Sequence, residues 1–364
     1  MAIRILHVLN GLGNGGTESF LMNLYRSIDR EKVQFDFLVR SNDNLRYEQE
    51  VKELGGNIYT TPPYPQKLIK NFKAVNNFFR EHPEYEIIHV HSNSLMYIYP
   101  LIVAKKQGIK CRIVHSHSTK TQNDRLYKYI HLFNRLFVGR FSTHRFACST
   151  EAGNWMFKDL TFEIINNGID INKFSYKEDV RNEVRHEFGI SNEYVIGHVG
   201  RFVNAKNHQF LLNLFKIILE KDVNVKLLLV GNGELKSKIQ RMVAENGMGN
   251  AVVFTDARND VERLMQAMDV FVFPSVFEGL GIVAIEAQSS GLHTIVSEHI
   301  PQEAFVSGYI ESISLNEGAN RWASRILELK ELNVRRNTVD RNRINTYDIK
   351  TIANKLEKFY LDEI

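Results

Sequence analysis

Short apolar runs recur along this chain and alternate with longer segments in which apolar residues return every three or four positions. Short runs bounded by glycine or polar residues are typical of buried strands, and a period of three to four residues is typical of helices. Their alternation predicts βαβ units with parallel sheets, so we expect an α/β protein. The predicted strands are residues 3–9, 35–39, 58–60, 87–91, 112–115, 145–147, 195–199, 226–230, 252–254 and 270–273, and the predicted helices include 67–80, 97–106 and 349–361.

The segment PSVFEGLGIVAIEAQSSG, residues 274–291, combines a glycine turn with two carboxylates. Glu278 precedes the turn at residues 279–281, and Glu286 lies about one turn into the amphipathic helix that we expect to follow. A strand, a glycine turn and a helix start form a phosphate site because free backbone N–H groups point at the anion. Carboxylates accept paired hydrogen bonds from vicinal hydroxyls, so the segment suits a nucleotide-sugar. Alternatively, Glu278 caps the helix and Glu286 lies on a solvated face, although the small and apolar neighbours of Glu286 favour a packed position.

Two cations follow another predicted strand. Arg201 and Lys206 come after residues 195–199 and before an expected helix near Asn207. Arginine makes forked contacts with phosphate and lysine acts as a point charge, so the pair can form a diphosphate clamp. The alternative is ordinary surface charge.

Glycine turns also follow the first strand, at residues 10–16, and the strand 226–230, at residues 231–233. Such turns let the backbone approach a ligand closely. Thr17 and Glu18 are expected to open the helix after the first turn. Many α/β folds carry a turn of this kind without a ligand, so this signal is weak by itself.

Two histidine pairs lie at predicted strand ends, His89 with His91 and His115 with His117. Ligands of open parallel sheets bind outside the carboxyl ends of the strands, so both pairs are candidates for a site. Paired histidines can bind metal, but no neighbouring Cys, Asp or Glu completes a ligand set. We therefore expect no metal site, and we interpret His89 as structural.

Residues 101–150 carry ten Lys and Arg against one acidic residue. Within residues 120–145 the apolar positions 126, 130, 133 and 137 share one helical face. Apolar and basic residues together favour an anionic membrane surface or a lipid-diphosphate acceptor. A core-packed helix with a solvated basic face is the alternative, and no recognised module supports nucleic acid. The predicted patch for the membrane or the lipid acceptor comprises Arg125, Lys128, Arg135 and Arg140.

A length of 364 residues indicates about two domains. Only two cysteines occur, which favours the reducing cytoplasm over a disulfide-bonded extracellular protein. No apolar run approaches the roughly 20 residues of a membrane-spanning helix, and the N-terminal residues are typical of a strand instead of a signal peptide. We therefore expect a cytoplasmic protein that is peripheral on the inner face of the cell membrane.

The paired glutamates inside PSxxEGLGxxxIEAxxSG resemble the motif of retaining glycosyltransferases of family four, which have the GT-B fold, and particularly the bacterial enzymes of capsular or exopolysaccharide synthesis. The Gly-Arg-x4-Lys pattern from Gly200 to Lys206 resembles the donor-phosphate motif of that family. The resemblance implies two Rossmann-like domains with parallel sheets facing an interdomain cleft. Residues 1–172 would bind the acceptor, 173–345 would bind the nucleotide-sugar, and the helix within 346–364 would cross back to the first domain.

The resemblance also implies roles for individual residues. Those implied for catalysis are His117, Glu278, Arg201 and Lys206. Those implied for the donor are Gly16, Arg201, Lys206, Asn232, Ala257, Arg258, Glu278, Gly279, Leu280, Gly281 and Glu286. Those implied for the acceptor are Asn14, Gly15, Thr17 and His117. The chain departs from the family pattern at Asp256, where glycine is frequent, at His293, where proline is usual, and in residues 297–305.

The implied activity is transfer of a hexose, with retention, from a UDP-sugar to a lipid-linked glycan acceptor. No Asp-x-Asp occurs in the sequence, so we expect the Arg201 and Lys206 clamp to replace a divalent metal, with no cofactor. Two alternatives remain open from the residues alone. One is a nucleotide-sugar epimerase of the same fold, and the other is a non-catalytic nucleotide-sugar-binding protein docked on the membrane.

Overall fold

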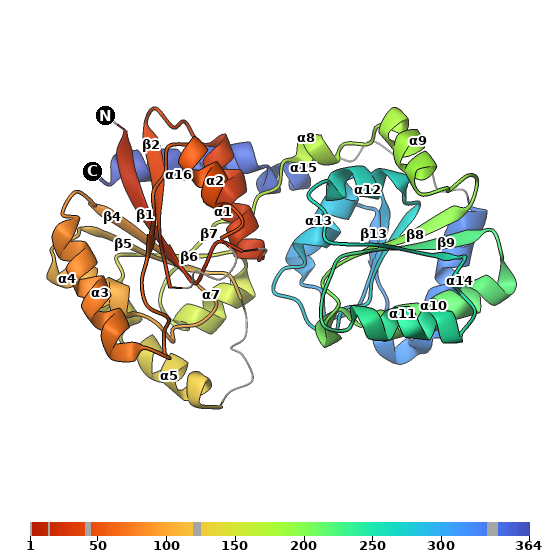
Figure 1. Cartoon of the computed structure of the whole chain (residues 1–364), viewed down its shortest axis with the longest axis horizontal. Coiled ribbons are helices and arrows are strands. Elements are labelled where there is room, and N and C mark those ends of the chain that lie inside the picture. The colour runs from red at the N-terminus through yellow and green to blue at the C-terminus, as the bar shows by residue number, and fades with distance from the viewer. Residues whose placement is uncertain (1, 14, 41–44, 119–124, 333–340) are drawn as a thin grey trace. The chain divides into compact units, whose positions relative to one another are not determined.

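The computed structural model describes residues 2–13, 15–40, 45–118, 125–332 and 341–364. The chain divides into two compact units. In Figure 1 the first runs from red to yellow-green and includes the blue helix at the C-terminus, and the second runs from yellow-green to blue. Unit 1 comprises Met1–Asp170 and Thr346–Ile364, and unit 2 comprises Ile171–Asn345. The last helix of the chain thus belongs to the first unit.

Unit 1 is built on a seven-stranded parallel sheet with the order β3-β2-β1-β4-β5-β6-β7. Its strands are β1 (Ile3–Leu9), β2 (Val33–Val39), β3 (Ile58–Thr60), β4 (Ile87–Ser92), β5 (Cys111–Ser116), β6 (His144–Ala147) and β7 (Glu163–Ile164). Its helices are α1 (Gly16–Ser27), α2 (Glu48–Glu53), α3 (Leu68–Glu81), α4 (Tyr99–Lys106), α5 (Arg125–Arg135), α6 (Val138–Phe141), α7 (Thr150–Phe157) and α16 (Ile349–Asp362).

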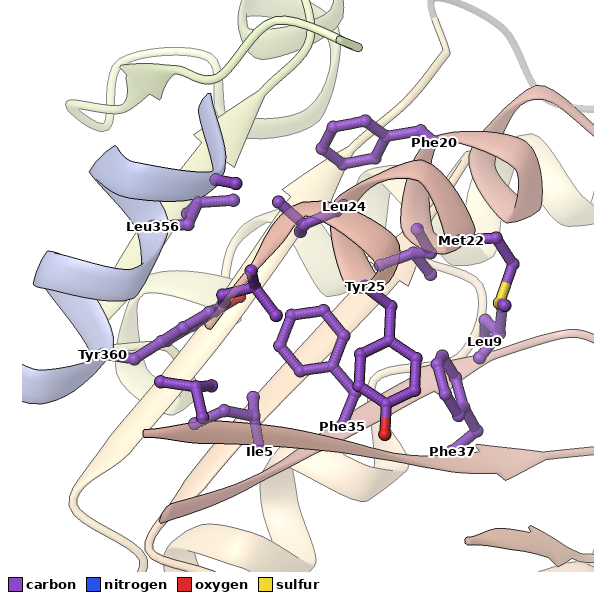
Figure 2. Close-up of a cluster of buried hydrophobic side chains, with 14 of the residues drawn as sticks. Ile5, Leu9, Phe20, Met22, Leu24, Tyr25, Phe35, Phe37, Leu356 and Tyr360 are labelled. Carbon is purple, nitrogen blue, oxygen red and sulfur yellow. The ribbon is translucent and has the colours of Figure 1, made fainter. Parts of the chain in front are cut away.

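Helices cover both faces of this sheet, as the apolar strands require. Side chains of α3, α4 and α7 form one core with one face. On the other face, α1 and α16 pack over β1 and β2. Figure 2 shows Tyr25 of α1 and Tyr360 of α16 converging on Phe35 and Ile5.

Unit 2 has a six-stranded parallel sheet with the order β10-β9-β8-β11-β12-β13. Its core includes the fully buried Trp322. The strands are β8 (Tyr194–Val199), β9 (Val225–Val230), β10 (Val252–Thr255), β11 (Val270–Phe273), β12 (His293–Val296) and β13 (Ile310–Ser312). The α-helices are α8 (Ile171–Phe174), α9 (Glu178–Glu187), α10 (His208–Lys221), α11 (Lys236–Glu245), α12 (Val261–Ala267), α13 (Ile282–Ser289), α14 (Gly318–Glu331) and α15 (Arg341–Ile344), and 3-10 turns span Asn204–Lys206, Gln302–Ala304 and Leu315–Glu317.

The two parallel sheets confirm the predicted fold class, and the predicted strands agree within a few residues. The helix predicted at 97–106 begins at Tyr99, because Pro100 suits the first turn of a helix. The amphipathic character expected for α13 is wrong, since the helix has no exposed residue and is packed on every side. No helix in the described parts of the chain has the length and apolarity needed to cross a bilayer.

Candidate active site

The predicted diphosphate clamp follows β8 in unit 2. Lys206 ends the short turn after this strand, and its Nζ donates to Glu278 Oε1 at 2.6 Å. The same ammonium lies 4.6 Å from the centre of the Phe273 ring. Arg201 is exposed, and the described residues supply no ion pair to its guanidinium. Two predicted catalytic residues therefore contact each other directly, while Arg201 keeps its donors available.

The glycine turn before α13 has the backbone geometry that a phosphate site needs. Gly281 has a φ of +76°, in the left-handed region that favours glycine, and α13 starts at the next residue. The first N–H groups of a helix have no partner within it. The turn at residues 279–281 can thus offer N–H groups and the positive end of a helix dipole to an anion.

The loops after β8 and β9 approach each other closely. The N–H of Phe202 donates to the Asn232 carbonyl at 3.0 Å. A Cβ added to Gly233 would lie 2.7 Å from the backbone nitrogen and oxygen of Phe202, so a larger residue would push the loops apart. Asn232 is therefore fixed beside the loop that carries Arg201.

Glu286 has an unusual environment for a carboxylate. Desolvation by burial, and then the charge of Glu262, raise its pKa to about 7. The side chain is half-buried, and its carboxyl group has no hydrogen-bond partner within the described part of the chain. A group in this state gains most from a ligand that brings hydrogen-bond donors. The packed position expected from the sequence is confirmed.

The segment predicted to hold the nucleobase follows β10. The guanidinium of Arg258 is paired with Asp260 and with Glu187, each at 2.8 Å, and Lys236 pairs with Asp256 at 2.7 Å. These pairs fix the conformation of the loop around the exposed Ala257. The backbone role of Ala257 and Arg258 stays a prediction.

The first glycine loop of unit 1 ends at the start of α1. Gly15 caps this helix and Gly16 is its first residue, and both are exposed. The Glu18 side chain folds back so that a Cβ on Gly15 would lie 2.1 Å from its Oε2. Thr17 is half-buried, and Asn14 lies outside the described residues.

A chain of hydrogen-bonded side chains reaches His117 from inside unit 1. His7 Nδ1 lies 2.9 Å from His91 Nε2, and His91 Nδ1 lies 2.9 Å from His117 Nε2. His117 Nδ1 lies 3.3 Å from Asn167 Oδ1. Burial lowers the pKa of His117 to about 4 and that of His7 to about 3, so both rings are neutral at physiological pH.

The direction of these hydrogen bonds follows from the last acceptor in the series. Asn167 presents an oxygen, which accepts, so His117 carries its proton on Nδ1 and accepts on Nε2. His91 and His7 must then also carry their protons on Nδ1. His7 Nε2 remains a buried lone pair without a partner in the described residues, whereas the reverse direction would leave a buried N–H unpaired, which is rarer. Both ring nitrogens of His117 are therefore occupied before any ligand binds.

The structure brings a third histidine to each histidine pair, whereas the sequence argument considered only Cys, Asp and Glu as further metal ligands. Ring nitrogens of His7, His89 and His91 lie within 4.8 Å of one another, as do those of His91, His115 and His117. His7 becomes a neighbour because β1 pairs with β4, which the sequence does not reveal. The 2.9 Å separations are hydrogen-bond distances, whereas two nitrogens bound to one zinc ion at about 2.0–2.1 Å lie about 3.3 Å apart. His89 instead bonds to the Tyr360 hydroxyl at 2.7 Å.

Helix α5, in the basic segment, turns its apolar residues outward. Its inner side is polar, since His131 accepts from the Leu95 N–H at 3.0 Å and Asn134 donates to the Leu95 carbonyl at 2.7 Å. The exposed fractions of Phe133 and Leu136 are 63% and 78%. The core-packed alternative is therefore wrong for this helix. The exposed apolar residues, which we call the α5 apolar face, are Leu126, Tyr129, Phe133, Leu136 and Phe137. Of the predicted basic residues, Lys128 and Arg140 are exposed and Arg135 is half-buried. The side chain of Arg125 lies outside the described part of the structure.

Comparison with known proteins decides the family. Residues 14–173 match the model of Glycosyltransferase Family 4, and residues 180–346 match that of Glycosyl transferases group 1. The chain is 34% identical to putative glycosyltransferase EpsF of Bacillus subtilis over 89% of this chain and 86% of EpsF. The chain belongs to the family-four, group 1 glycosyltransferases.

Two further similarities concern an enzyme and a solved structure. The chain is 25% identical to the UDP-Gal:alpha-D-GlcNAc-diphosphoundecaprenol alpha-1,3-galactosyltransferase of Escherichia coli, over 82% of this chain and 81% of that enzyme. Its fold matches the crystal structure of Anabaena Alr3699/HepE in complex with UDP and glucose, with a TM-score of 0.80, 16% identity and coverage of 99% and 100%. The GT-B fold class is thus confirmed.

In this glycosyltransferase, the structure brings Lys206 and Glu278 into contact within unit 2, with Arg201 and the glycine turn at strand ends of the same sheet. His117 and the first glycine loop lie at strand ends of unit 1. Roles that join residues of the two units stay predictions. Sequence reasoning missed His7 and Asn167. The one available signal was that His7 lies within the predicted strand 3–9, where its side chain is expected to be buried.

Proposed function

We propose that this glycosyltransferase moves a hexose from a UDP-sugar to a lipid-diphosphate-linked glycan during capsular or exopolysaccharide synthesis. The observation that carries the proposal is the contact between Lys206 and Glu278 beside the open donors of Arg201. Cations and a carboxylate at the strand ends of one sheet match the two parts of a nucleotide-sugar, its diphosphate and its hydroxyls. The UDP named for HepE and the UDP-Gal named for the galactosyltransferase support the choice of base.

The chemical task is the departure of UDP from the anomeric carbon. Arg201 and Lys206 would stabilise the charge that develops on the leaving diphosphate, and the N–H groups at residues 279–281 would add hydrogen bonds. Glu278 would orient the hexose while its contact with Lys206 holds both groups in position. Glu286 would accept hydrogen bonds from the ribose. Because two fixed cations face the diphosphate, we propose that no divalent metal is required, and the family resemblance supports retention.

The α5 apolar face supports a membrane-bound acceptor. A helix on a soluble surface normally buries its apolar side, whereas α5 packs through His131 and Asn134 and exposes its apolar side beside Lys128. Basic and apolar residues on one exposed face suit the headgroup region of an anionic bilayer. The diphosphoundecaprenol in the name of the galactosyltransferase is an acceptor of this kind. The enzyme would thus work on the cytoplasmic face of the cell membrane.

Calorimetric titration with UDP and with GDP, each repeated with EDTA, tests the donor site. We expect UDP binding that EDTA does not change and that Arg201→Ala abolishes. Lys206→Ala should lose about 2–4 kcal/mol of transition-state stabilisation, which is roughly 30- to 1000-fold in kcat/KM. Lys216→Ala, on the exposed side of α10, is the matched control and should behave like the wild type.

Three outcomes would contradict the proposal. Wild-type transfer by Lys206→Ala would reject the clamp, and UDP binding that EDTA removes would reject metal independence. Conversion of the nucleotide-sugar without any acceptor would instead indicate an epimerase.

A further inference from the structure

Arg40 occupies a position where ligands of parallel sheets bind. It follows Val39, the last residue of β2, at the carboxyl edge of the unit 1 sheet. Its backbone N–H donates to the carbonyl of Asn10 at 3.2 Å. Arg40 thus lies directly beside the start of the first glycine loop.

Two tyrosine rings form the wall around the Arg40 guanidinium. Its central carbon lies 4.5 Å from the centre of the Tyr97 ring and 5.9 Å from that of Tyr64. The Tyr97 hydroxyl donates to Asn71 Oδ1 at 2.8 Å, and the Tyr64 hydroxyl donates to the Met96 carbonyl at 3.2 Å. Both rings are therefore held in place. Their faces attract a cation but offer no acceptor to its N–H groups.

The Arg40 guanidinium has no counterion in the described residues. Its Nε and Nη1 atoms are buried without a hydrogen-bond partner, and no ion pair involves this side chain there. Burial lowers its pKa, opposed by Tyr97 and Tyr64, yet an arginine stays protonated in proteins. An unpaired buried charge is among the most costly features of a fold. An anion bound at this position would supply the missing counterion.

We propose that Arg40 is the anchor of an anion subsite in unit 1 that binds the diphosphate of the acceptor. A guanidinium has a rigid fork of donors that matches phosphate oxygens, and the glycine loop beside it can add backbone N–H groups. The subsite rests on the proposed lipid-diphosphate acceptor. Its position agrees with that role, because His131 and Asn134 of α5 bond to the backbone of Leu95, two residues before Tyr97 of the same wall.

Inorganic pyrophosphate is the first probe, and Arg201→Gln is the background, because it removes the donor clamp as a competing site. We expect pyrophosphate to bind this full-length protein, and Arg40→Gln to weaken the binding about tenfold or more. Arg80→Gln is the control, since Arg80 is an exposed arginine on α3 whose loss should change nothing. Equal pyrophosphate affinity with and without Arg40, or no binding at all, would overturn the proposal.

Geranyl diphosphate is the second probe, because it carries the same diphosphate on a short prenyl chain. Tighter binding than pyrophosphate that is also lost in Arg40→Gln assigns the subsite to a lipid-linked acceptor. Equal affinities for geranyl diphosphate and pyrophosphate, both lost in Arg40→Gln, assign the subsite to a free diphosphate. UDP titration of the wild type is run in parallel, so a failed donor site and a failed Arg40 subsite are told apart.

Thermal unfolding of the ligand-free protein gives an independent result. Arg40→Met keeps the aliphatic stem and removes a charge without a partner, so its Tm should equal or exceed that of the wild type. A Tm several degrees lower would show that the chain itself pairs the guanidinium and would overturn the proposal. A similar loss of Tm in Asp43→Asn would also overturn the proposal. Asp43 is the carboxylate nearest to Arg40 along the sequence, and it lies outside the described residues.

Discussion

Replacing Glu286 with glutamine should stabilise the ligand-free protein increasingly above pH 4.5, with the full effect at neutral and alkaline pH. The ordinary pKa of glutamic acid is 4.5, and burial with the nearby Glu262 raises that of Glu286 to about 7. The folded state therefore holds the proton over a pH range in which the unfolded state has released it. At about 1.36 kcal/mol per pKa unit, the carboxylate costs the folded state up to about 3 kcal/mol above pH 7.

The sign of this effect determines the shape of the pH dependence. Below pH 4.5 the carboxyl group is protonated in both states and contributes nothing. Between pH 4.5 and 7 the wild type loses stability as the pH rises, because its folded state binds more protons. Glu286→Gln carries no proton to lose, so its advantage should grow from about zero at pH 4.5 to about 3 kcal/mol at pH 8.

Urea denaturation at pH 4.5, 6 and 8 measures this difference. The fully buried Trp322 reports on unit 2 when Trp155→Phe removes the other tryptophan. Glu245→Gln, on the exposed side of α11, is the control and should show no growing advantage. A constant offset at all three pH values, or a less stable Glu286→Gln at pH 8, would refute the reasoning. The same variant should bind UDP-sugar more weakly, since an amide has one acceptor oxygen where a carboxylate has two.

Two further predictions concern unit 1. Phe133→Ser combined with Leu136→Ser should weaken flotation with anionic vesicles and leave the Tm unchanged, because both side chains are exposed; unaltered flotation would show that α5 is not the membrane face. Nitrogen NMR of the imidazole rings should find His117 neutral with its proton on Nδ1 from pH 5.5 to 8, and Asn167→Leu, which removes the accepting oxygen, should weaken this preference. A proton on Nε2 of His117 in the wild type would mean that the hydrogen-bond chain runs in the opposite direction.

Features coded by neighbouring residues could be predicted from the sequence. The alternation of apolar runs and helical periods indicated parallel sheets, since each strand and helix is specified by its own residues. The segment around Glu278 and Glu286 is equally local, because one strand, one turn and one helix contain it. The amphipathic expectation for α13 failed because its polar residues are packed as well as its apolar ones, and Gln288 finds hydrogen-bond partners in these surroundings.

Contacts between distant strands could not be predicted in the same way. His7 meets His91, and Arg40 meets Tyr97, only because β1 lies between β2 and β4 in the sheet. Strand order depends on how the whole chain folds, and no local pattern encodes it. The contact of Lys206 with Glu278 belongs to the same class, since it joins loops that follow two different strands. The orientation of α5 also required the structure, because its sequence leaves open which side faces inward.

Helix α16 has a consequence for how this protein is made. Its residues Ile352, Leu356 and Tyr360 complete the core of unit 1, and Tyr360 bonds to His89 beside the chain that ends at His117. A ribosome synthesises residues 1–170 first, yet it must add all of unit 2 before these side chains exist. The unit that is translated first is therefore the one completed last. During synthesis the face of its sheet beside α1 stays partly uncovered, and chaperones can bind the exposed apolar residues until translation ends.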